Sequence, residues 1–500
     1  QLPTQPIIGR DGRILIDVPD GITSDTGKQR YAEIAGKTVK QAQVAIVEML
    51  KTSGDLRGEP RAIMHPVKFF EKGDRPLEIV TSRQWYIRNG GRDTDLRGAL
   101  LNRGENLVWH PDHMRHRYSN WVEGLNGDWL ISRQRYFGVP VPVWYPVDAD
   151  GETVHDSPIV PTEDMLPIDP STDVPVGYTA DQRNQPNGFI GDPDVMDTWA
   201  TSSLSPQIAG KWEDDADLFG RIFPMDLRPQ AHDIIRTWLF STVVRSNFEH
   251  DSLPWKNAAL SGWILDPDRK KMSKSKGNVV TPVDLFEKFG SDAVRYWAAS
   301  ARPGIDTAFS EDQMKVGKKL ATKLLNATKF VLTFPQPNVD AKPTHPVDLA
   351  MLARVAETVR EATVAFDQYD YARALERTEA MFWWFCDDYV ELVKGRVYNS
   401  QGLDASGSAI SALRLALSAL QRLLAPFMPF TTETVWRWWK DGSVHTATWP
   451  TAAELGPIGD STILDPIGEI LSQVRRAKTD AKTSQKTAVT EATVSAPETV

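Results

Sequence analysis

Apolar residues recur at helical spacing along most of the chain after residue 312. Four such stripes follow one another, with short loops between them: Val316, Leu320, Leu324 and Val331; Leu349, Leu352, Val359 and Phe366; Leu375, Phe382, Phe385, Tyr389 and Leu392; Ile410, Leu413, Leu417, Leu420 and Leu424. This spacing places the apolar side chains on one face of a helix, and short loops make neighbouring helices antiparallel. The pattern therefore predicts an antiparallel helical bundle.

Shorter apolar runs, separated by glycine and proline, fill the first 310 residues. Their spacing predicts helices at about 39–51, 112–123, 231–249 and 283–298, and strands at about 77–80, 141–145 and 258–265. A strand that is followed by a glycine-bearing loop and a helix is typical of an α/β core. Residues 147–195 are rich in Pro, Gly and Asp, which indicates a loop-dominated insertion.

Composition excludes several classes of protein. The 500 residues are 41% hydrophobic and 25% charged, which is ordinary for a folded protein. The net charge of −9 excludes nucleic-acid binding by bulk positive charge, but not by local basic patches. Cys386 is the one cysteine, so a disulfide framework is excluded. The single cysteine fits a reducing cytoplasm, where we expect the protein. No apolar run reaches the ~18 residues of a membrane span, so we expect no membrane contact.

The sharpest chemical signal is a basic loop. It contains five cations, two serines and a closing Gly–Asn pair: Arg269, Lys270, Lys271, Lys274, Lys276, Ser273, Ser275, Gly277 and Asn278. Ammonium and hydroxyl donors suit a polyphosphate that gains charge in a transition state. The alternative is a solvated basic loop.

The run Lys271-Met-Ser-Lys-Ser275 matches the KMSKS signature of the class I aminoacyl-tRNA synthetases letter for letter, so the chain resembles that family. Residues 132–140 (SRQRYFGVP) resemble a motif of the isoleucyl and valyl subgroup. Residues 194–199 (DVMDTW) and 232–238 (HDIIRTW) are similar to the valyl pattern. The resemblance covers nearly all 500 residues and is greatest to valyl enzymes of the actinobacterial kind.

The resemblance implies an ATP site. In it, Lys271 and Lys274 would be catalytic, because they would bind the ATP phosphates and stabilise the transition state as valine attacks the α-phosphate. Met272, Ser273 and Ser275 belong to the same ATP-binding loop. Asp233 would hold the ribose hydroxyls of ATP; the alternative is a carboxylate that stabilises a helix N-terminus.

The resemblance also implies a pocket for the valine side chain, lined by Trp199, Ile234 and Trp238. Ile234 and Trp238 are four residues apart, which would place them on one face of a regular helix. The alternative for all three residues is ordinary core packing.

The resemblance further implies how the chain is divided. Residues 1–75 would be the tail of the editing domain, 76–310 the catalytic Rossmann half with the KMSKS loop, 311–346 a stem-contact helix and linker, 347–450 the anticodon-binding bundle, and 451–500 a junction towards a coiled coil. The family's HIGH signature occurs nowhere in the sequence. We therefore expect an incomplete piece of a longer enzyme that is inactive by itself.

Three histidines, His110, His113 and His116, are the best candidates for metal ligands. Neither a cysteine nor an obvious carboxylate joins them, and neighbouring arginines favour a basic surface that faces RNA. We therefore predict no protein-bound metal. Cys386 lies in an aromatic helical stripe and is interpreted as a buried structural thiol.

Two basic rows fit contact with tRNA phosphates. They are Lys315, Lys318, Lys319, Lys323 and Lys329, and Arg475, Arg476, Lys478, Lys482 and Lys486. The alternative for each is a solvated helix face. The tryptophans 436, 438 and 439 could stack on anticodon bases, although packing at the end of the bundle is an equal alternative.

The predicted fold class is α/β plus all-α: the second half of a class I Rossmann fold followed by a helical anticodon-binding bundle. The resemblance implies a monomer that joins valine to tRNA(Val), with ATP and Mg²⁺ as substrate, and that edits mischarged threonine in its complete form. Two alternatives remain, an isoleucyl-tRNA synthetase and a non-catalytic tRNA-binding module.

Overall fold

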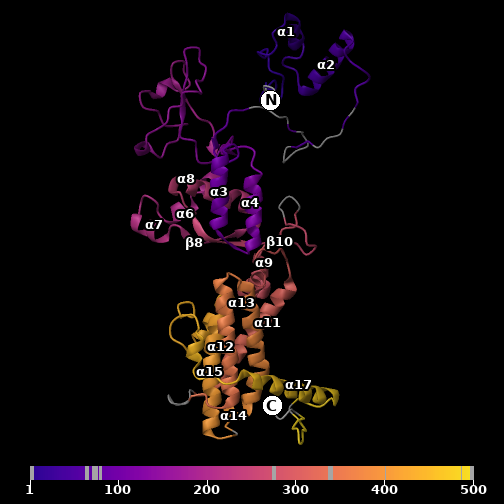
Figure 1. Ribbon diagram of the computed structural model, residues 1–500, viewed down its shortest axis with the longest axis vertical. Helices are drawn as coiled ribbons and strands as arrows, with labels where there is room; N and C mark the ends of the chain where they lie inside the picture. Colours follow the sequence, from indigo (N-terminus) through magenta and orange to yellow (C-terminus); the bar gives the residue numbers. More distant parts are fainter. Residues whose placement is uncertain are drawn as a thin grey trace. The chain divides into compact units, whose positions relative to one another are not determined.

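The computed structural model describes residues 5–61, 63, 67–69, 77, 82–272, 277–335, 342–399, 401–485 and 487–495. Ser273, Lys274, Ser275 and most of the strand predicted at 77–80 lie outside these residues. The chain forms two compact units, residues 1–87 with 128–197 and residues 88–127 with 198–500, and each is described by itself (Figure 1).

The first unit begins with two helices, α1 (Asp25–Ala32) and α2 (Val39–Ser53), around a small core of Ile14, Tyr31, Ile34 and Ala42. A capping box starts α2, since the side chains of Thr38 and Gln41 each accept the backbone N–H of the other residue. The helix predicted at 39–51 is confirmed.

The rest of the first unit is built from short antiparallel strand pairs. They are β1 (Tyr86–Ile87) with β3 (Trp129–Leu130), β4 (Ser132–Arg133) with β7 (Val195–Met196), and β5 (Trp144–Pro146) with β6 (Phe189–Gly191). The strand predicted at 141–145 is wrong in its bounds, because β5 begins only at Trp144. Between β5 and β6 the chain runs mainly in loops, with the 3-10 turns η2 (Glu163–Met165) and η3 (Ala180–Gln182), as predicted for the insertion.

The second unit contains a three-stranded parallel sheet in the order β2 (Val108–His110), β9 (Trp255–Ser261), β8 (Met225–Ala231). Helix α8 (Phe240–His250) connects β8 to β9, as a parallel pair requires. Helices α3 (Thr94–Asn106) and α4 (Arg115–Glu123) pack beside α8 (Figure 1). The buried ring of Tyr118 on α4 lies 5.7 Å from Trp109 and 6.2 Å from Phe240, between centroids.

Three predicted elements are broken at defined points. The helix predicted at 231–249 is a 3-10 turn, η4 (His232–Ile234), then a π-helical turn, η5 (Ile235–Leu239), then α8. The helix predicted at 283–298 is α9 (Val283–Phe289) and α10 (Ser291–Ala299), separated by Gly290 at φ 89°. The helix predicted at 112–123 starts with a 3-10 turn, η1 (Asp112–Met114), before α4.

The strand predicted at 258–265 is interrupted at Gly262. Strand β9 ends at Ser261, and β10 (Ile264–Leu265) pairs in parallel with β11 (Thr307–Ala308). A Cβ atom at Gly262 would clash with the backbone carbonyl of Ile305, so the close approach of the two segments requires glycine.

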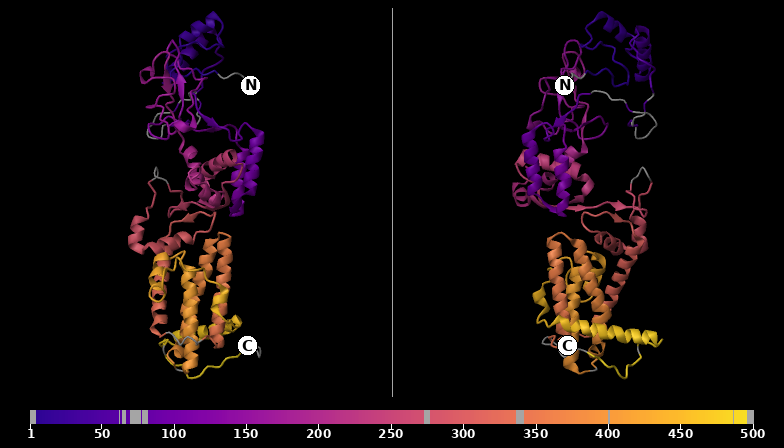
Figure 2. Two further views of the ribbon diagram at one scale, coloured as in Figure 1. Left: turned by 90° about the vertical axis from the view of Figure 1, so that its left-hand side faces the viewer. Right: turned by 45° about the vertical axis from the view of Figure 1, so that its right-hand side comes forward.

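The bundle of the second unit is formed by α11 (Glu311–Thr333), α12 (Pro346–Asp367), α13 (Tyr371–Trp384), a π-helical turn η7 (Phe385–Tyr389), α14 (Val390–Val397) and α15 (Leu403–Leu424). The long helices lie side by side (Figure 2). They share one core, to which Leu320, Val355, Phe382 and Leu417 each contribute a buried side chain. The four predicted stripes are confirmed.

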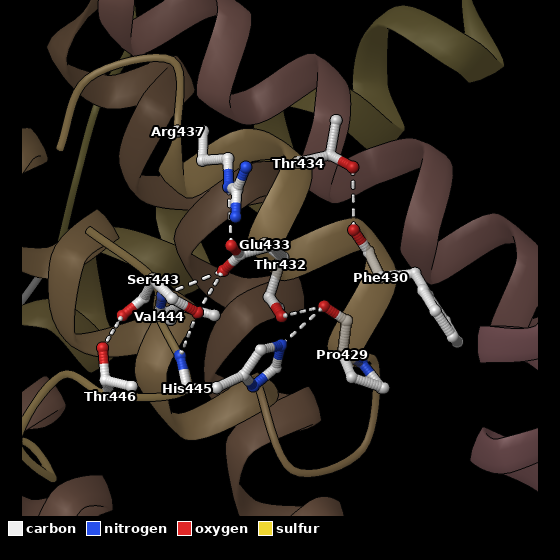
Figure 3. A network of polar contacts seen from close by, with 10 residues as sticks. All are labelled: Pro429, Phe430, Thr432, Glu433, Thr434, Arg437, Ser443, Val444, His445 and Thr446. Atoms are coloured by element: carbon white, nitrogen blue, oxygen red, sulfur yellow. Dashed lines mark hydrogen bonds and ion pairs between the residues drawn. The ribbon is translucent and has the colours of Figure 1, made fainter. Parts of the chain in front are cut away.

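Two more helices follow, α16 (Pro429–Trp436) and α17 (Leu464–Asp480), and neither was predicted. Glu433 of α16 accepts hydrogen bonds from Arg437 Nε at 2.6 Å and from Ser443 Oγ and the Val444 amide, each at 2.9 Å (Figure 3). These bonds fasten the turn at 443–446 to α16. Within the described residues, no helix has the length and apolar character that spanning a bilayer requires.

Candidate active site

The candidate site lies at the carboxyl edge of the parallel sheet. Ala231, the last residue of β8, pairs with Ser261, the last residue of β9. His232 and Asp233 follow directly after β8, and Trp263 follows two residues after β9. Ligands of open α/β sheets bind at this edge, where the strand ends bring loops together.

The structure brings Lys271 and Asp233 together. Lys271 Nζ lies 3.8 Å from Asp233 Oδ2 and 4.1 Å from the ring centroid of Trp263. The two charged side chains are 51% and 36% exposed, so their attraction is weak, at most about 1 kcal/mol. A ligand can therefore replace either partner at little cost.

Four residues that the sequence analysis did not assign to this site surround the pair: Asp306, Trp263, His232 and Arg117. Asp306 accepts the Trp263 amide at 2.8 Å and lies 3.4 Å from His232 Nε2. The His232 ring lies 4.7 Å from the Trp263 ring, and Arg117 Nη1 lies 3.2 Å from His232 Nδ1. Because a guanidinium only donates, Nδ1 accepts and Nε2 carries the proton toward Asp306.

The hydrogen bond from the Trp263 amide lowers the pKa of Asp306, and the contact with His232 adds to this effect. Asp306 is therefore an ionised acceptor at neutral pH. In the sequence, Asp306 is only a carboxylate in the short loop before α11. Its partners Trp263 and His232 lie 43 and 74 residues away, so no local pattern could reveal them.

A further carboxylate closes the base of the KMSKS loop. Asp266 accepts the Lys270 amide at 2.7 Å and Asn278 Nδ2 at 2.8 Å. Asn278 Nδ2 also lies 3.2 Å from the Lys271 carbonyl. These hydrogen bonds, the one from Lys270 first, lower the pKa of Asp266. Met272 is half-buried at the start of the segment that the structure does not describe.

Trp238, which the sequence analysis assigned to the amino-acid pocket, is fixed by two contacts of its indole nitrogen. Its Nε1 donates to the Ser202 carbonyl at 3.0 Å and lies 3.2 Å from Ser205 Oγ. Ser202 ends α5 (Thr198–Ser202), the helix that carries Trp199, and α5 contacts η5. Trp199, Ile234 and Trp238 are all half-buried. Ile234 lies in a 3-10 turn and Trp238 in a π-turn, so the regular helix face expected for them is wrong.

The three candidate metal ligands lie on different elements. His110 ends β2, where its Nε2 lies 3.0 Å from Asn257 Oδ1 and its ring 4.6 Å from Tyr369. His113 and His116 are exposed on η1 and α4. Among the described residues no group of three or more His, Cys, Asp or Glu side chains could hold a metal ion. Burial raises the pKa of Cys386 to about 12, which makes the thiol a poor nucleophile.

Four of the five lysines of the first basic row, all except Lys329, line a hollow of about 710 Å³. Its walls include Lys288, Lys315, Lys318, Lys319 and Lys323, together with Phe289 and Trp383. Some of these charges are already paired, because Lys315 lies 2.8 Å from Asp312 and Lys323 lies 2.6 Å from Asp387. In the second row, Arg475 lies 2.9 Å from Asp388.

The tryptophans at the end of the bundle have different environments. Trp436 is buried, and Trp439 donates to Gln421 Oε1 at 3.1 Å. Trp438 is 42% exposed. The structure therefore assigns packing to Trp436 and Trp439 and leaves Trp438 open to a partner.

Comparisons with known proteins agree with this architecture. The family of tRNA synthetases class I (I, L, M and V) matches residues 30–310, and the anticodon-binding domain of tRNA ligase matches residues 348–494. Among solved structures, a LeuRS from Agrobacterium radiobacter covers 66% of this chain and 43% of its own, with a TM-score of 0.52 at 20% identity. A methionyl-tRNA synthetase from Mycobacterium tuberculosis covers 69% and 61%, with a TM-score of 0.50 at 22% identity. These structures support the fold.

Curated relatives match nearly the whole chain. A valine–tRNA ligase from Thermobifida fusca is 63% identical over 99% of this chain and 57% of its own length. A valine–tRNA ligase from Cutibacterium acnes is 57% identical over 100% of this chain and 58% of its own length. The chain thus spans somewhat more than half the length of these relatives. The family match over residues 30–310 covers more than half of the chain and confirms the predicted α/β and all-α fold class. The chain belongs to the class I tRNA synthetases of the I, L, M and V group.

Proposed function

We propose that this chain is part of a valine–tRNA ligase, which activates valine with ATP and transfers it to tRNA(Val). The observation that carries the proposal is the 63% identity, over 99% of the chain, to a protein named valine–tRNA ligase. The geometry at the edge of the sheet supports it, because Lys271 and Asp233 lie 3.8 Å apart there, and Trp238, five residues after Asp233, donates to the helix that carries Trp199.

In this proposal, Lys271 and Lys274 bind the phosphates of ATP, which enters as its magnesium complex. Class I synthetase chemistry is a displacement at phosphorus, so positioning and charge stabilisation supply most of the catalysis. Asp233 receives the ribose hydroxyls, as a carboxylate with two acceptor oxygens can do. Ser273, Ser275 and Met272 complete the loop that covers the triphosphate.

Trp199, Ile234 and Trp238 form the proposed wall around the valine side chain. An apolar wall rejects threonine poorly, because threonine has nearly the same shape; this weak rejection is already known for valyl-tRNA synthetases. We therefore include hydrolytic editing of threonine in the proposed function of the longer protein. The bundle is proposed to bind the anticodon arm. A monomer in the cytoplasm is part of the same proposal.

The test is amino-acid-dependent ATP–pyrophosphate exchange by a protein of the relatives' full length that contains this segment. Valine should support exchange far better than isoleucine. In that protein, Lys274→Ala should lower kcat by about 10²–10³, the usual cost of losing one donor to transition-state charge. Lys256→Ala is the matched control, because Lys256 is an exposed lysine of the same unit that pairs with Asp226 at 2.9 Å.

An unchanged kcat with only a raised KM for valine would contradict the role of Lys274. Exchange that depends on isoleucine would favour the isoleucyl alternative. For the 500-residue chain alone we expect no exchange, since the HIGH sequence that the family uses for ATP is not in it. tRNA binding by a longer protein that lacks all exchange would favour the non-catalytic module.

A further inference from the structure

Arg228 is a buried cation without an acidic partner. It lies in the middle of β8, paired with Ala258 of β9, and is 6% exposed. Its Nε donates to Gln230 Oε1 at 3.3 Å, and its second terminal nitrogen has no hydrogen-bond partner among the described residues. No described carboxylate lies within ion-pair distance of this guanidinium. Burying a charge in this way is costly unless another interaction offsets it.

The offsetting interaction is with two indole rings. The guanidinium carbon lies over the ring of Trp238, in direct contact, and 4.9 Å from the ring centroid of Trp255. A planar guanidinium stacks on an aromatic face, and the attraction grows when the pair is shielded from water. Burial lowers the pKa of Arg228 to about 9, which still leaves it charged near neutral pH.

Trp238 is thereby fixed on one face as well as on one edge. The edge is held by the hydrogen bonds of Nε1 to the Ser202 carbonyl and Ser205 Oγ. The guanidinium covers one face of the indole, so only the opposite face and the free edge remain for a ligand. If the ring moved away from Arg228, the buried cation would lose its nearest partner and keep only Trp255 and Gln230.

We propose that Arg228 is a positioning residue that makes the Trp238 wall rigid and thereby sets the selectivity of the amino-acid pocket for valine over isoleucine. The inference rests on the proposed function. It assigns to Arg228, which lies behind Trp238, control over the largest side chain that the amino-acid pocket accepts. A rigid wall excludes a longer branched side chain, whereas a wall that can move yields to it. One methylene in an apolar enzyme pocket changes selectivity by about 10–200-fold, a general value that includes tRNA synthetases.

The experiment measures kcat/KM for valine, isoleucine and threonine by pyrophosphate exchange in the full-length protein. Arg228→Met keeps a flexible, unbranched side chain, two atoms shorter than that of arginine, and removes its charge and plane. We expect its preference for valine over isoleucine to fall at least about tenfold, within the range given by one methylene. The preference for valine over threonine should stay the same, because both side chains fit the wall without moving it. Damage to the whole site would change both ratios.

Two further variants keep the test decisive if Arg228→Met does not fold. Ser205→Ala removes one acceptor of Trp238 Nε1 and leaves Arg228 intact, so it should lower the valine-over-isoleucine ratio in the same direction by a smaller factor. Arg228→Lys keeps the charge without the plane and should give an intermediate ratio. Arg245→Met is the matched control, because Arg245 is a largely buried arginine that bonds Ser203 Oγ at 2.9 Å and Glu249.

An unchanged valine-over-isoleucine ratio in folded Arg228→Met and Ser205→Ala would overturn the inference. An equal gain in affinity for all three amino acids would also overturn it, since that result would mean that the guanidinium only fills space. If the unaltered protein shows no valine-dependent exchange, the proposed function itself fails, and the two failures are therefore distinct.

Discussion

At the scale of single residues, the KMSKS loop depends on a carboxylate outside the signature. Asp266 joins Lys270 and Asn278, which stand on either side of the loop. With both bonds made, the two ends of the loop stay in register. This arrangement restricts the positions that Lys271 can reach.

We predict that Asp266→Asn lowers the kcat of valine-dependent exchange in the full-length protein by about tenfold. The asparagine side chain keeps one acceptor oxygen but turns an NH₂ group toward the Lys270 amide or toward Asn278 Nδ2, so one of the two hydrogen bonds of Asp266 is lost. Exchange kinetics at pH 7 would measure this. Asp268→Asn should have no effect, because Asp268 is exposed and lies 3.7 Å from Lys270. Equal kinetics of the two variants would contradict the role of Asp266.

The lowered pKa of Asp266 determines how folding stability changes with pH. Its pKa is lowered in the folded protein, so its contribution is complete above the unfolded value of about 3.9. The contribution is lost only as the pH falls through the lower, folded value. Stability should therefore decline at acid pH less steeply in Asp266→Asn than in the unaltered chain.

Single residues were predictable from the sequence where a signature names them. Lys271 and Asp233 were both selected, and the structure places them 3.8 Å apart. Asp266, Trp263 and Asp306 were missed because their roles come from contacts between segments. No local pattern distinguishes Asp306 from any other loop carboxylate.

At the scale of elements, α10 and α16 are joined by one buried carboxylate. Asp292 of α10 accepts the Phe430 amide at 3.2 Å and the amide and hydroxyl of Thr431 at 2.6 Å each. Phe430 and Thr431 are in the first turn of α16, where amide groups have no partner within the helix. Asp292 therefore acts as a cap supplied by another helix.

We predict that Asp292→Ala destabilises the chain by about 1–3 kcal/mol, since amides at a buried helix start lose their acceptor. Urea unfolding followed by circular dichroism would measure the change. Asp284→Ala is the control, because Asp284 lies exposed on the neighbouring helix α9. A destabilisation no larger than that of the control would show that water replaces the cap.

Elements were predictable where an apolar stripe was long. The stripes of α11, α12 and α15 gave helices of 22 or 23 residues. The break of the helix predicted at 231–249 was not predictable, because the π-turn at 235–239 accompanies the contacts of Trp238 with Ser202 and Ser205. Those partners come from a separate part of the sequence.

At the scale of the whole molecule, α11 belongs to the bundle core. Leu320, Leu324 and Val331 of α11 are fully buried in the same cluster as the side chains of α12 to α15. The division into a stem-contact helix at 311–346 and a bundle at 347–450 remains a prediction about function. An independently folding piece should include α11.

We predict that residues 291–485, which include α10 with the Asp292 cap and the core residue Tyr296, fold alone and bind tRNA(Val) with modest affinity that falls as salt rises. Phosphate contacts release counterions, with a slope of about −0.7 to −0.9 per contact. Some preference for the valine anticodon should persist at higher salt, because unpaired bases offer faces to an exposed ring such as Trp438. Filter binding with native and swapped anticodons at two salt concentrations would measure the salt dependence of the affinity and the preference for the valine anticodon. Equal affinity for both tRNAs would reduce the bundle to a nonspecific basic surface.

The contact between Lys271 and Asp233 has a consequence for the order of events. In the proposed function, the Asp233 carboxylate binds either the ammonium of Lys271 or the ribose hydroxyls of the nucleotide. The ammonium and the sugar compete for the carboxylate, so binding of the sugar favours release of Lys271 toward the phosphates. Because the pair is exposed and contributes at most about 1 kcal/mol, this competition changes the population of released Lys271 by less than about tenfold.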